Sequence, residues 1–206
     1  LAFISFLTSE ELLAVVNSEG QPIQDEFEIS AHKDSTCAID DTGVKCWGYI
    51  QKDYPVPAIS GPWVAVSVGD IYGCVLRGAE GSREVVCWGS GAQGQLSVPS
   101  LVNPRQISAG DSAACALDDN GLHCWGSDTY GIVSLAPYLV NPIKVEVATY
   151  HACARDAIGF QCWGTNNFGQ LSIPDLLPEV YGDVTDFDLG AGATCAINSG
   201  GAGCWG

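Results

Sequence analysis

Apolar and polar residues alternate in five short stretches that recur at regular intervals along the chain. One apolar side chain stands eight residues before a cysteine, and another stands six before it. The first set is Ile29, Val66, Ile107, Val145 and Phe187, and the second is Ala31, Val68, Ala109, Val147 and Leu189. Alternation with a period of two places side chains on opposite faces of an extended strand. The pattern therefore predicts a β-strand before each of these cysteines.

Each predicted strand leads into a longer repeated motif. Its five copies are CAIDDTGVKCWG (37–48), CVLRGAEGSREVVCWG (74–89), CALDDNGLHCWG (115–126), CARDAIGFQCWG (153–164) and CAINSGGAGCWG (195–206). Their first cysteines are 37, 41, 38 and 42 residues apart, and such a period indicates a propeller, a solenoid or an array. Glycine and proline separate the strands, as in GQLS at 94–97 and 169–172 and LVNP at 101–104 and 139–142. We predict an all-β, β-propeller-like array of five blades of about 40 residues.

The N-terminal segment 1–28 does not carry the motif, so the repeat domain is expected to span 29–206. Thr8 and Glu11 have the spacing of a capping box, which predicts a short helix from Ser9 to Val16. The stretch SEELLAVV (9–16) also aligns, with one gap, over NFGQLSIP (167–174). The segment could thus complete the last blade and close the ring. If the ring is left open, the same segment could act as a donor strand for a neighbouring molecule.

The two cysteines of each motif flank a turn. In the first copy the turn is DDTG (40–43), which is typical of a β-hairpin. A two-residue loop would place Cys37 opposite Cys46, with Cβ atoms about 4.5–5.5 Å apart and close to disulfide range. The four-residue insertion in the second copy has even length and keeps each cysteine on its face. We predict the disulfides Cys37–Cys46, Cys74–Cys87, Cys115–Cys124, Cys153–Cys162 and Cys195–Cys204.

Other uses of the cysteines fit their spacing less well. Zinc sites pair cysteines two to four residues apart, and redox sites use C-x-x-C. The chain contains neither spacing. Buried free thiols remain the other structural interpretation.

Composition places the protein outside the reducing cytosol and away from polyanions. The chain has ten cysteines and no methionine among 206 residues, and this cysteine content suits an oxidising compartment. We expect a secreted, extracellular or cell-surface protein. The formal net charge of −16 disfavours nucleic-acid binding, since a phosphate backbone repels an acidic surface. No run of about 18 apolar residues is present, so membrane insertion is not expected.

With these residues in view, the motif C-A-[IL]-x-x-x-G-x-x-C-W-G, followed in two copies by GQL, resembles the regulator of chromosome condensation repeat, especially its bacterial secreted, Cys-paired forms. The likeness covers 29–206 and is most specific in the hairpin and the Trp-Gly pair. It implies a β-propeller used as a binding surface. Members of the family usually have seven blades, with repeats nearer fifty residues, so five short units depart from the pattern. The family's nucleotide-exchange activity is not carried over, because no long inserted wedge is visible.

The five repeated tryptophans recur at one position of the motif. Recurrence in every unit predicts packing between blades for Trp47, Trp88, Trp125, Trp163 and Trp205. Sites of function are instead expected where the copies differ. Candidates for partner contact are Trp63, which lies outside the motif, and Arg77 and Arg83 at the insertion of the second copy.

The repeat pattern does not bring residues for catalysis or metal binding together. His32, His123 and His151 occupy non-equivalent places, so no catalytic triad can be assigned and no enzyme is predicted. No cofactor is expected, although Asp183, Asp186 and Asp188 cluster in a run where oxygen ligands could bind Ca²⁺. Alternation predicts instead that Asp186 and Asp188 share a solvated strand face, opposite Phe187.

The sequence thus predicts a non-catalytic, extracellular β-propeller protein that acts as a protein-interaction module. The alternative is a structural subunit of a cell-surface assembly or filament, a homopolymer built by strand exchange through the N-terminus. A secreted hydrolase is the third interpretation.

Overall fold

The computed structural model of the chain describes residues 28–173 and 184–206. These residues form five three-stranded antiparallel sheets, one for each copy of the motif. The all-β, propeller-like fold predicted from the alternation is therefore confirmed. The predicted helix from Ser9 to Val16 and Asp183 lie outside the described residues, as does the segment 1–28 except for Glu28.

Each blade takes three consecutive strands of the chain. The strands are β1 (Ile29–His32), β2 (Ser35–Asp40), β3 (Gly43–Gly48), β4 (Trp63–Val68), β5 (Tyr72–Arg77), β6 (Glu84–Gly89), β7 (Gln106–Ala109), β8 (Ala113–Asp118), β9 (Gly121–Gly126), β10 (Lys144–Val147), β11 (His151–Arg155), β12 (Phe160–Gly164), β13 (Asp186–Leu189), β14 (Thr194–Asn198) and β15 (Gly201–Trp205). A single short helix among these residues, α1 (Tyr49–Asp53), follows the first blade.

The hairpin that carries each cysteine pair has the predicted register. In the first blade Asp40 pairs directly with Gly43, which leaves a two-residue loop at 41–42 and sets Cys37 opposite Cys46. Gly43 has a φ of +126°, a conformation that glycine adopts readily. All five predicted disulfides are present, one in each blade, and no cysteine is free.

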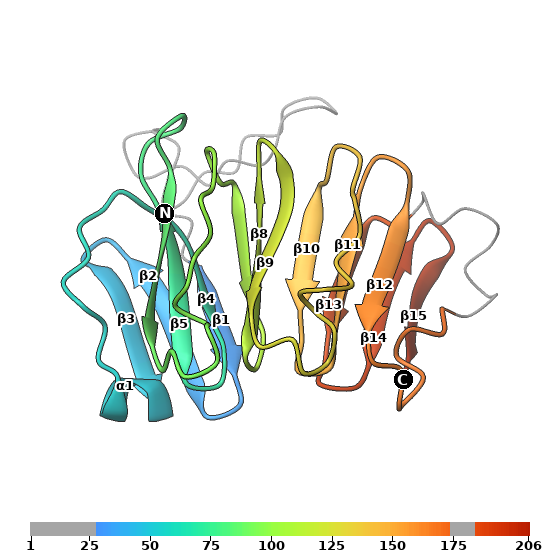
Figure 1. Cartoon of the computed structure of the whole chain (residues 1–206), viewed down its shortest axis with the longest axis horizontal. Coiled ribbons are helices and arrows are strands. Elements are labelled where there is room, and N and C mark those ends of the chain that lie inside the picture. Colours follow the sequence, from blue (N-terminus) through green and yellow to red (C-terminus); the bar gives the residue numbers. More distant parts are fainter. Residues whose placement is uncertain (1–27, 174–183) are drawn as a thin grey trace, which may run out of the picture.

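The blades follow one another in chain order, from the blue end of the chain to the red (Figure 1). Their first strands, β1, β4, β7, β10 and β13, contact one another in succession and form the inner side of the array. The array is not closed into a ring by the described residues. Closure by the N-terminal segment stays a prediction, because that segment lies outside them.

Apolar side chains pack between neighbouring blades rather than within one. One cluster joins Cys37 and Ile39 of the first blade to Val66 of the second, and equivalent clusters lie at the next boundaries. Adjacent turns also approach closely. A Cβ atom on Gly110 would lie 2.4 Å from the carbonyl oxygen of Ala148 in the next blade. A Cβ atom on Gly69 would likewise lie 2.3 Å from the carbonyl oxygen of Gly110, so close contacts account for glycine at this repeat position in the second and third copies.

No helix among the described residues has the length and apolar content needed to cross a membrane.

Candidate functional site

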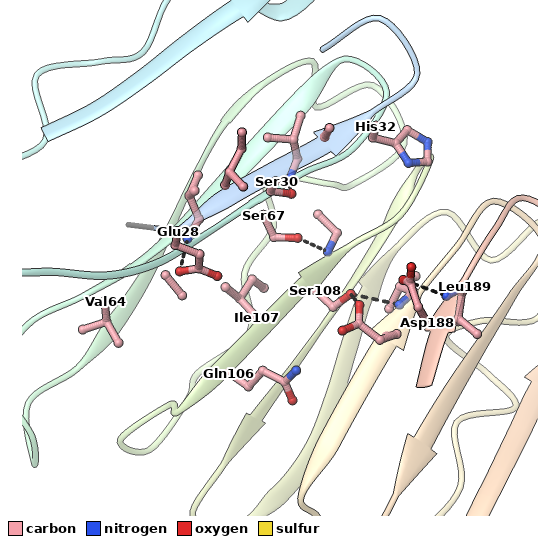
Figure 2. A pocket seen from close by; sticks show the side chains of 18 of the residues that line it. Glu28, Ser30, His32, Val64, Ser67, Gln106, Ile107, Ser108, Asp188 and Leu189 are labelled. Atoms are coloured by element: carbon pink, nitrogen blue, oxygen red, sulfur yellow. Dashed lines mark hydrogen bonds between the residues drawn. The ribbon is translucent and has the colours of Figure 1, made fainter. Parts of the chain in front are cut away.

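The inner strands of all five blades line a concave pocket of about 530 Å³. Figure 2 shows that its walls carry polar side chains from strands far apart in the sequence, among them Ser30, Ser67, Ser108 and Asp188. The pocket thus brings side chains of all five blades together.

Serines seven residues before the first cysteine tie each inner strand to the next. Ser30 Oγ accepts a hydrogen bond from the backbone N–H of Val68, at 3.0 Å. Ser67 and Ser108 accept equivalent bonds from Ala109 and Val147, at 2.8 and 2.9 Å. These N–H groups lie on the strand edge that the blade's own sheet leaves unpaired. The serines therefore satisfy backbone donors that would otherwise be exposed at the pocket wall.

A second polar position, nine residues before the cysteine, bonds to the same edges. Glu28 Oε2 accepts from the N–H of Val66 at 3.1 Å. Gln106 both accepts from the N–H of Val145 at 2.9 Å and donates to its carbonyl at 3.0 Å. Together the two positions form a ladder of side-chain bonds between blades, which we call the inner ladder.

The inner ladder changes character in the last two blades, where carboxylates replace the serines. Glu146 accepts from Ser108 Oγ at 3.2 Å and lies 3.5 Å from Lys144 Nζ. Burial raises the pKa of Glu146 above its usual range, although Lys144 opposes the shift. The carboxylate of Asp188 accepts a hydrogen bond from the backbone N–H of the next residue, Leu189, at 2.9 Å. This wall of the pocket is therefore acidic.

The cationic groups near the pocket also bond to partners outside its lining. Arg105 donates to the backbone oxygens of Asp118 and Pro142, at 2.7 and 3.1 Å. Lys144 Nζ donates to Asp186 at 2.6 Å and to the carbonyl of Phe187 at 2.7 Å. The bond from Lys144 holds the pKa of Asp186 below its usual range.

The turns between first and second strands carry a further charged group at one end of the blades. Lys33 forms ion pairs with Asp70, at 3.4 Å, and with Asp111. His32 Nε2 lies 3.6 Å from Asp111. Burial acts against the charge on Lys33, yet the two carboxylates raise its pKa above its usual value. Residues of three successive blades thus meet at this end.

Four of the five repeated tryptophans pack as predicted, and one does not. Trp88, Trp125 and Trp163 are buried, and Trp205 is partly buried. Trp47 is 48% exposed, so the prediction of core packing was wrong for the first blade. The other tryptophans are covered by the blade before them, and no described residue precedes the first blade to cover Trp47.

The candidates for partner contact lie together near the hairpin end of the second blade. Trp63 and Arg77 are neighbours across β4 and β5. Trp63 is only partly exposed, since its ring packs beside Gly43 and Gly61. Arg77 bonds to Ser60 and forms an ion pair with Glu84, and Arg83 lies in the same hairpin. Their role in binding a partner stays a prediction.

The histidines and aspartates take separate places. His151 is fully buried and bonds to Thr194 at 2.8 Å, whereas His123 bonds to Asp118 at 3.1 Å. Asp186 and Asp188 are on the exposed face of β13, opposite buried Phe187, as the alternation predicted. In 28–173 and 184–206, no three His, Cys, Asp or Glu side chains are grouped as metal ligands.

The inner ladder is not among the features predicted from the sequence, although its pattern is visible in the repeat. Between the apolar positions six and eight residues before the cysteine stands a polar residue in every copy. That residue is Ser30, Ser67, Ser108, Glu146 and Asp188 in the five copies. A polar residue that recurs on the strand face opposite the apolar residues was therefore a sequence signal for the ladder.

Comparison with known proteins agrees with the repeat and the fold. Residues 105–132 match the family model of the regulator of chromosome condensation (RCC1) repeat, which confirms the resemblance seen in the motif. The ectodomain of the receptor kinase CR4 from Physcomitrella patens is similar in structure, with a TM-score of 0.66 and 22% identity over 91% of this chain and 53% of that chain.

Two further solved structures share the fold. The CRINKLY WD40 ectodomain of the Arabidopsis thaliana receptor kinase ACR4 has a TM-score of 0.64 and 24% identity, over 90% of this chain and 67% of that one. Prp20p from Saccharomyces cerevisiae has a TM-score of 0.63 and 20% identity, over 84% of this chain and 56% of that one. The chain therefore spans between half and two thirds of these structures, and at such identities the likeness shows the fold alone.

Proposed function

Because the chain carries a regulator of chromosome condensation repeat on a propeller-like fold, we propose that it is a non-catalytic, extracellular module that binds a protein partner. The observation that carries this proposal is the concave pocket lined by the inner strands of all five blades. A concave surface with a few convergent polar groups is the usual form of a binding site. Glu146 and Asp188 make one wall acidic, which favours a basic segment of the partner.

Disulfides support the extracellular part of the proposal. All ten cysteines are paired, and such bonds persist in oxidising compartments. Two of the similar structures are receptor ectodomains, and a third was described together with its binding to Gsp1p and histones. The two ectodomains support a role outside the cell, and the binding of Prp20p to proteins supports a role in protein interaction.

The non-catalytic part of the proposal rests on how the fold uses its titratable groups. His151 is enclosed between blades, and Asp118 accepts bonds from the backbone N–H groups of Val102 and Asn120, at 2.7 Å each. In the described part of the chain these groups bond within and between blades, and so they hold the fold.

A peptide-display selection against the immobilised protein tests the proposal. We expect enrichment of Lys- and Arg-rich peptides. Their affinity should fall by about tenfold or more in Asp188→Lys, since charge reversal at an acidic site repels a basic ligand. Glu80→Lys, in the exposed hairpin turn of the second blade, is the matched control and should bind as the parent does. Enrichment of acidic peptides, or equal binding by both variants, would refute a role for the acidic wall.

Self-association is a second candidate, because no other blade among the described residues covers one face of the first blade. Trp47 is 48% exposed and Ile29 is 67% exposed, whereas their counterparts in the second blade, Trp88 and Val66, are buried. A second copy seated on this face would cover both side chains. Light scattering over a range of concentrations tests the idea, and Trp47→Ser should lower the mass of any oligomer. A monomer mass at all concentrations would exclude it.

A further inference from the structure

A second pocket of about 160 Å³ lies between the third and fourth blades, at the end where Lys33 meets Asp111. By the volume that a water occupies in the liquid, it has room for about five waters. Its lining includes Asp111, Ser127, Thr129, Tyr130 and Thr149. The space is thus large enough for a side chain and is mostly polar.

The pocket exists because the third blade has a small residue at a repeat position where the second and fourth blades have a large one. Two residues before the first cysteine, the second blade carries Tyr72, whose hydroxyl donates to the carbonyl of Ala113 at 2.8 Å. The fourth blade carries His151 at this position, and His151 reaches Thr194 in the fifth. The third blade has Ala113 there, and Ala113 lines the pocket. The space between the third and fourth blades is therefore left unfilled at this position.

A buried hydroxyl in this space lacks a partner. Thr149 is 8% exposed and lines the pocket, and its Oγ1 has no hydrogen-bond partner among the described residues. An unsatisfied buried polar group is costly and rare. The hydroxyl is therefore available to a ligand that enters the pocket.

The remaining lining favours a flat cation that donates hydrogen bonds. Asp111 supplies a carboxylate whose Oδ1 is paired with Lys33 and whose Oδ2 accepts, among the described residues, only a long bond from Ser112, at 3.4 Å. The hydroxyls of Ser127 and Thr129 lie 2.8 Å apart and can accept. Tyr130 adds an aromatic ring, held edge-on against Tyr150 with the ring centroids 4.9 Å apart. A guanidinium group is planar, donates five N–H bonds and stacks on aromatic rings. The chain's net charge of −16 attracts such a group over a longer range.

We propose that this pocket receives the guanidinium group of an arginine side chain, supplied by a basic segment of the protein partner. Thr149, Ser127 and Asp111 accept its hydrogen bonds, and Tyr130 stacks against it. The inference deepens the proposed function and rests on it for the source of the arginine. The pocket itself can be tested without the partner, because a free arginine derivative carries the same group.

The test is a titration of the ¹⁵N-labelled protein with N-acetyl-L-argininamide, followed by amide chemical shifts. We expect saturable shifts at Ser127, Tyr130 and Thr149. The uncharged isostere N-acetyl-L-citrullinamide should bind at least about tenfold more weakly, since it lacks the charge that strengthens the bonds to Asp111. Equal binding of the two compounds, or no saturable shift, would overturn the assignment.

Two variants separate the pocket from the rest of the surface. Thr149→Val keeps the shape but removes the hydroxyl, and Ala113→Tyr fills the space as Tyr72 fills its neighbour. Both should weaken binding of the arginine derivative by about tenfold or more. If Ala113→Tyr does not fold, Thr149→Val alone decides. Shifts confined to Glu146 and Asp188 would place the arginine in the larger pocket and refute this one.

Basic peptides from the display selection distinguish failure of this inference from failure of the proposed function. If they bind Thr149→Val and the parent equally, the guanidinium pocket is wrong and the proposed function stands. If the arginine derivative binds in the pocket but no peptide binds the protein, the pocket stands and its proposed partner does not.

Discussion

The indole nitrogen of Trp125 donates a hydrogen bond to the carbonyl oxygen of Gln95, at 2.9 Å, across the boundary between the third and second blades. Trp163 and Trp205 make the same bond to the loops that follow the third and fourth blades. Trp88 is equally buried, at 6% exposed, but its Nε1 has no hydrogen-bond partner in the described part of the chain. The loop after the first blade differs from the other three, because it contains helix α1.

This relationship predicts unequal effects of one substitution at two equivalent sites. Trp125→Phe and Trp88→Phe remove similar buried area, but only Trp125→Phe leaves the carbonyl of Gln95 without its donor. We expect Trp125→Phe to lower the free energy of unfolding by about 1 kcal/mol more than Trp88→Phe. Urea unfolding of both variants measures the difference. Equal losses would show that the bond contributes nothing to stability.

The close approach of neighbouring turns predicts a position-specific cost for alanine. In Gly110→Ala the new Cβ would meet the carbonyl oxygen of Ala148 at 2.4 Å, so the turns must separate. We expect a loss of about 1–3 kcal/mol, typical of overpacking. Gly190→Ala is the matched control, because its nearest described neighbour, in Ala193, lies 3.8 Å away. Thermal unfolding should therefore place Gly190→Ala near the parent and Gly110→Ala well below it.

The sequence predicts features that are set within one hairpin, but it does not predict features that depend on packing between blades. The pairing of Cys37 with Cys46 follows from the spacing and the DDTG turn, because a hairpin fixes its own register. The exposure of Trp47 does not follow, since it depends on what lies beside the first blade. Likewise the pocket beside Ala113 depends on how Thr149 of the next blade is placed, and a repeat pattern does not give the distance between two blades.

The inner ladder predicts that one hydroxyl stabilises the boundary between the third and fourth blades. Ser108→Ala removes the acceptor for the N–H of Val147 and the donor to Glu146. We expect a loss of about 1–3 kcal/mol, since a buried N–H would be left without a partner. Ser82→Ala, in an exposed hairpin turn, removes only a local bond to Ala79 and serves as the control. Equal stability of the two variants would contradict a structural role for the ladder.

Each disulfide should stabilise the fold by restricting the unfolded chain. For a loop of ten residues, the chain-entropy relation gives about 2.7 kcal/mol. We expect the double variant Cys115→Ala/Cys124→Ala to lose about that amount, with some additional loss from packing because Cys115 is fully buried. Unfolding of the parent with and without a reducing agent gives the combined effect of all five bonds. A double variant as stable as the parent would show that the disulfide adds no stability to a hairpin whose register is already fixed by its turn.

His151 predicts a loss of stability in mild acid. Burial lowers the pKa of His151 from 6.5 to about 4. As the pH falls below 6.5, the unfolded chain therefore binds a proton that the folded protein does not bind, and unfolding is favoured. The loss grows until the pH reaches about 4, where the folded protein also takes up the proton, and its total is about 3 kcal/mol. Carboxylates such as Asp118 and Asp156, whose pKa values are lowered by backbone hydrogen bonds despite burial, lose their contribution at still lower pH.

His151→Gln removes this titration and isolates its effect. Urea unfolding of the parent and the variant at intervals between pH 7 and pH 4 should give two curves of stability against pH that differ in slope. The parent should lose up to about 1.4 kcal/mol more per pH unit than the variant, because one additional proton is taken up on unfolding. The acidic residues titrate in both proteins, so their contribution cancels in the comparison. Parallel curves would mean that His151 is protonated alike in the folded and unfolded chains, and that its enclosure beside Thr194 does not exclude the charged form.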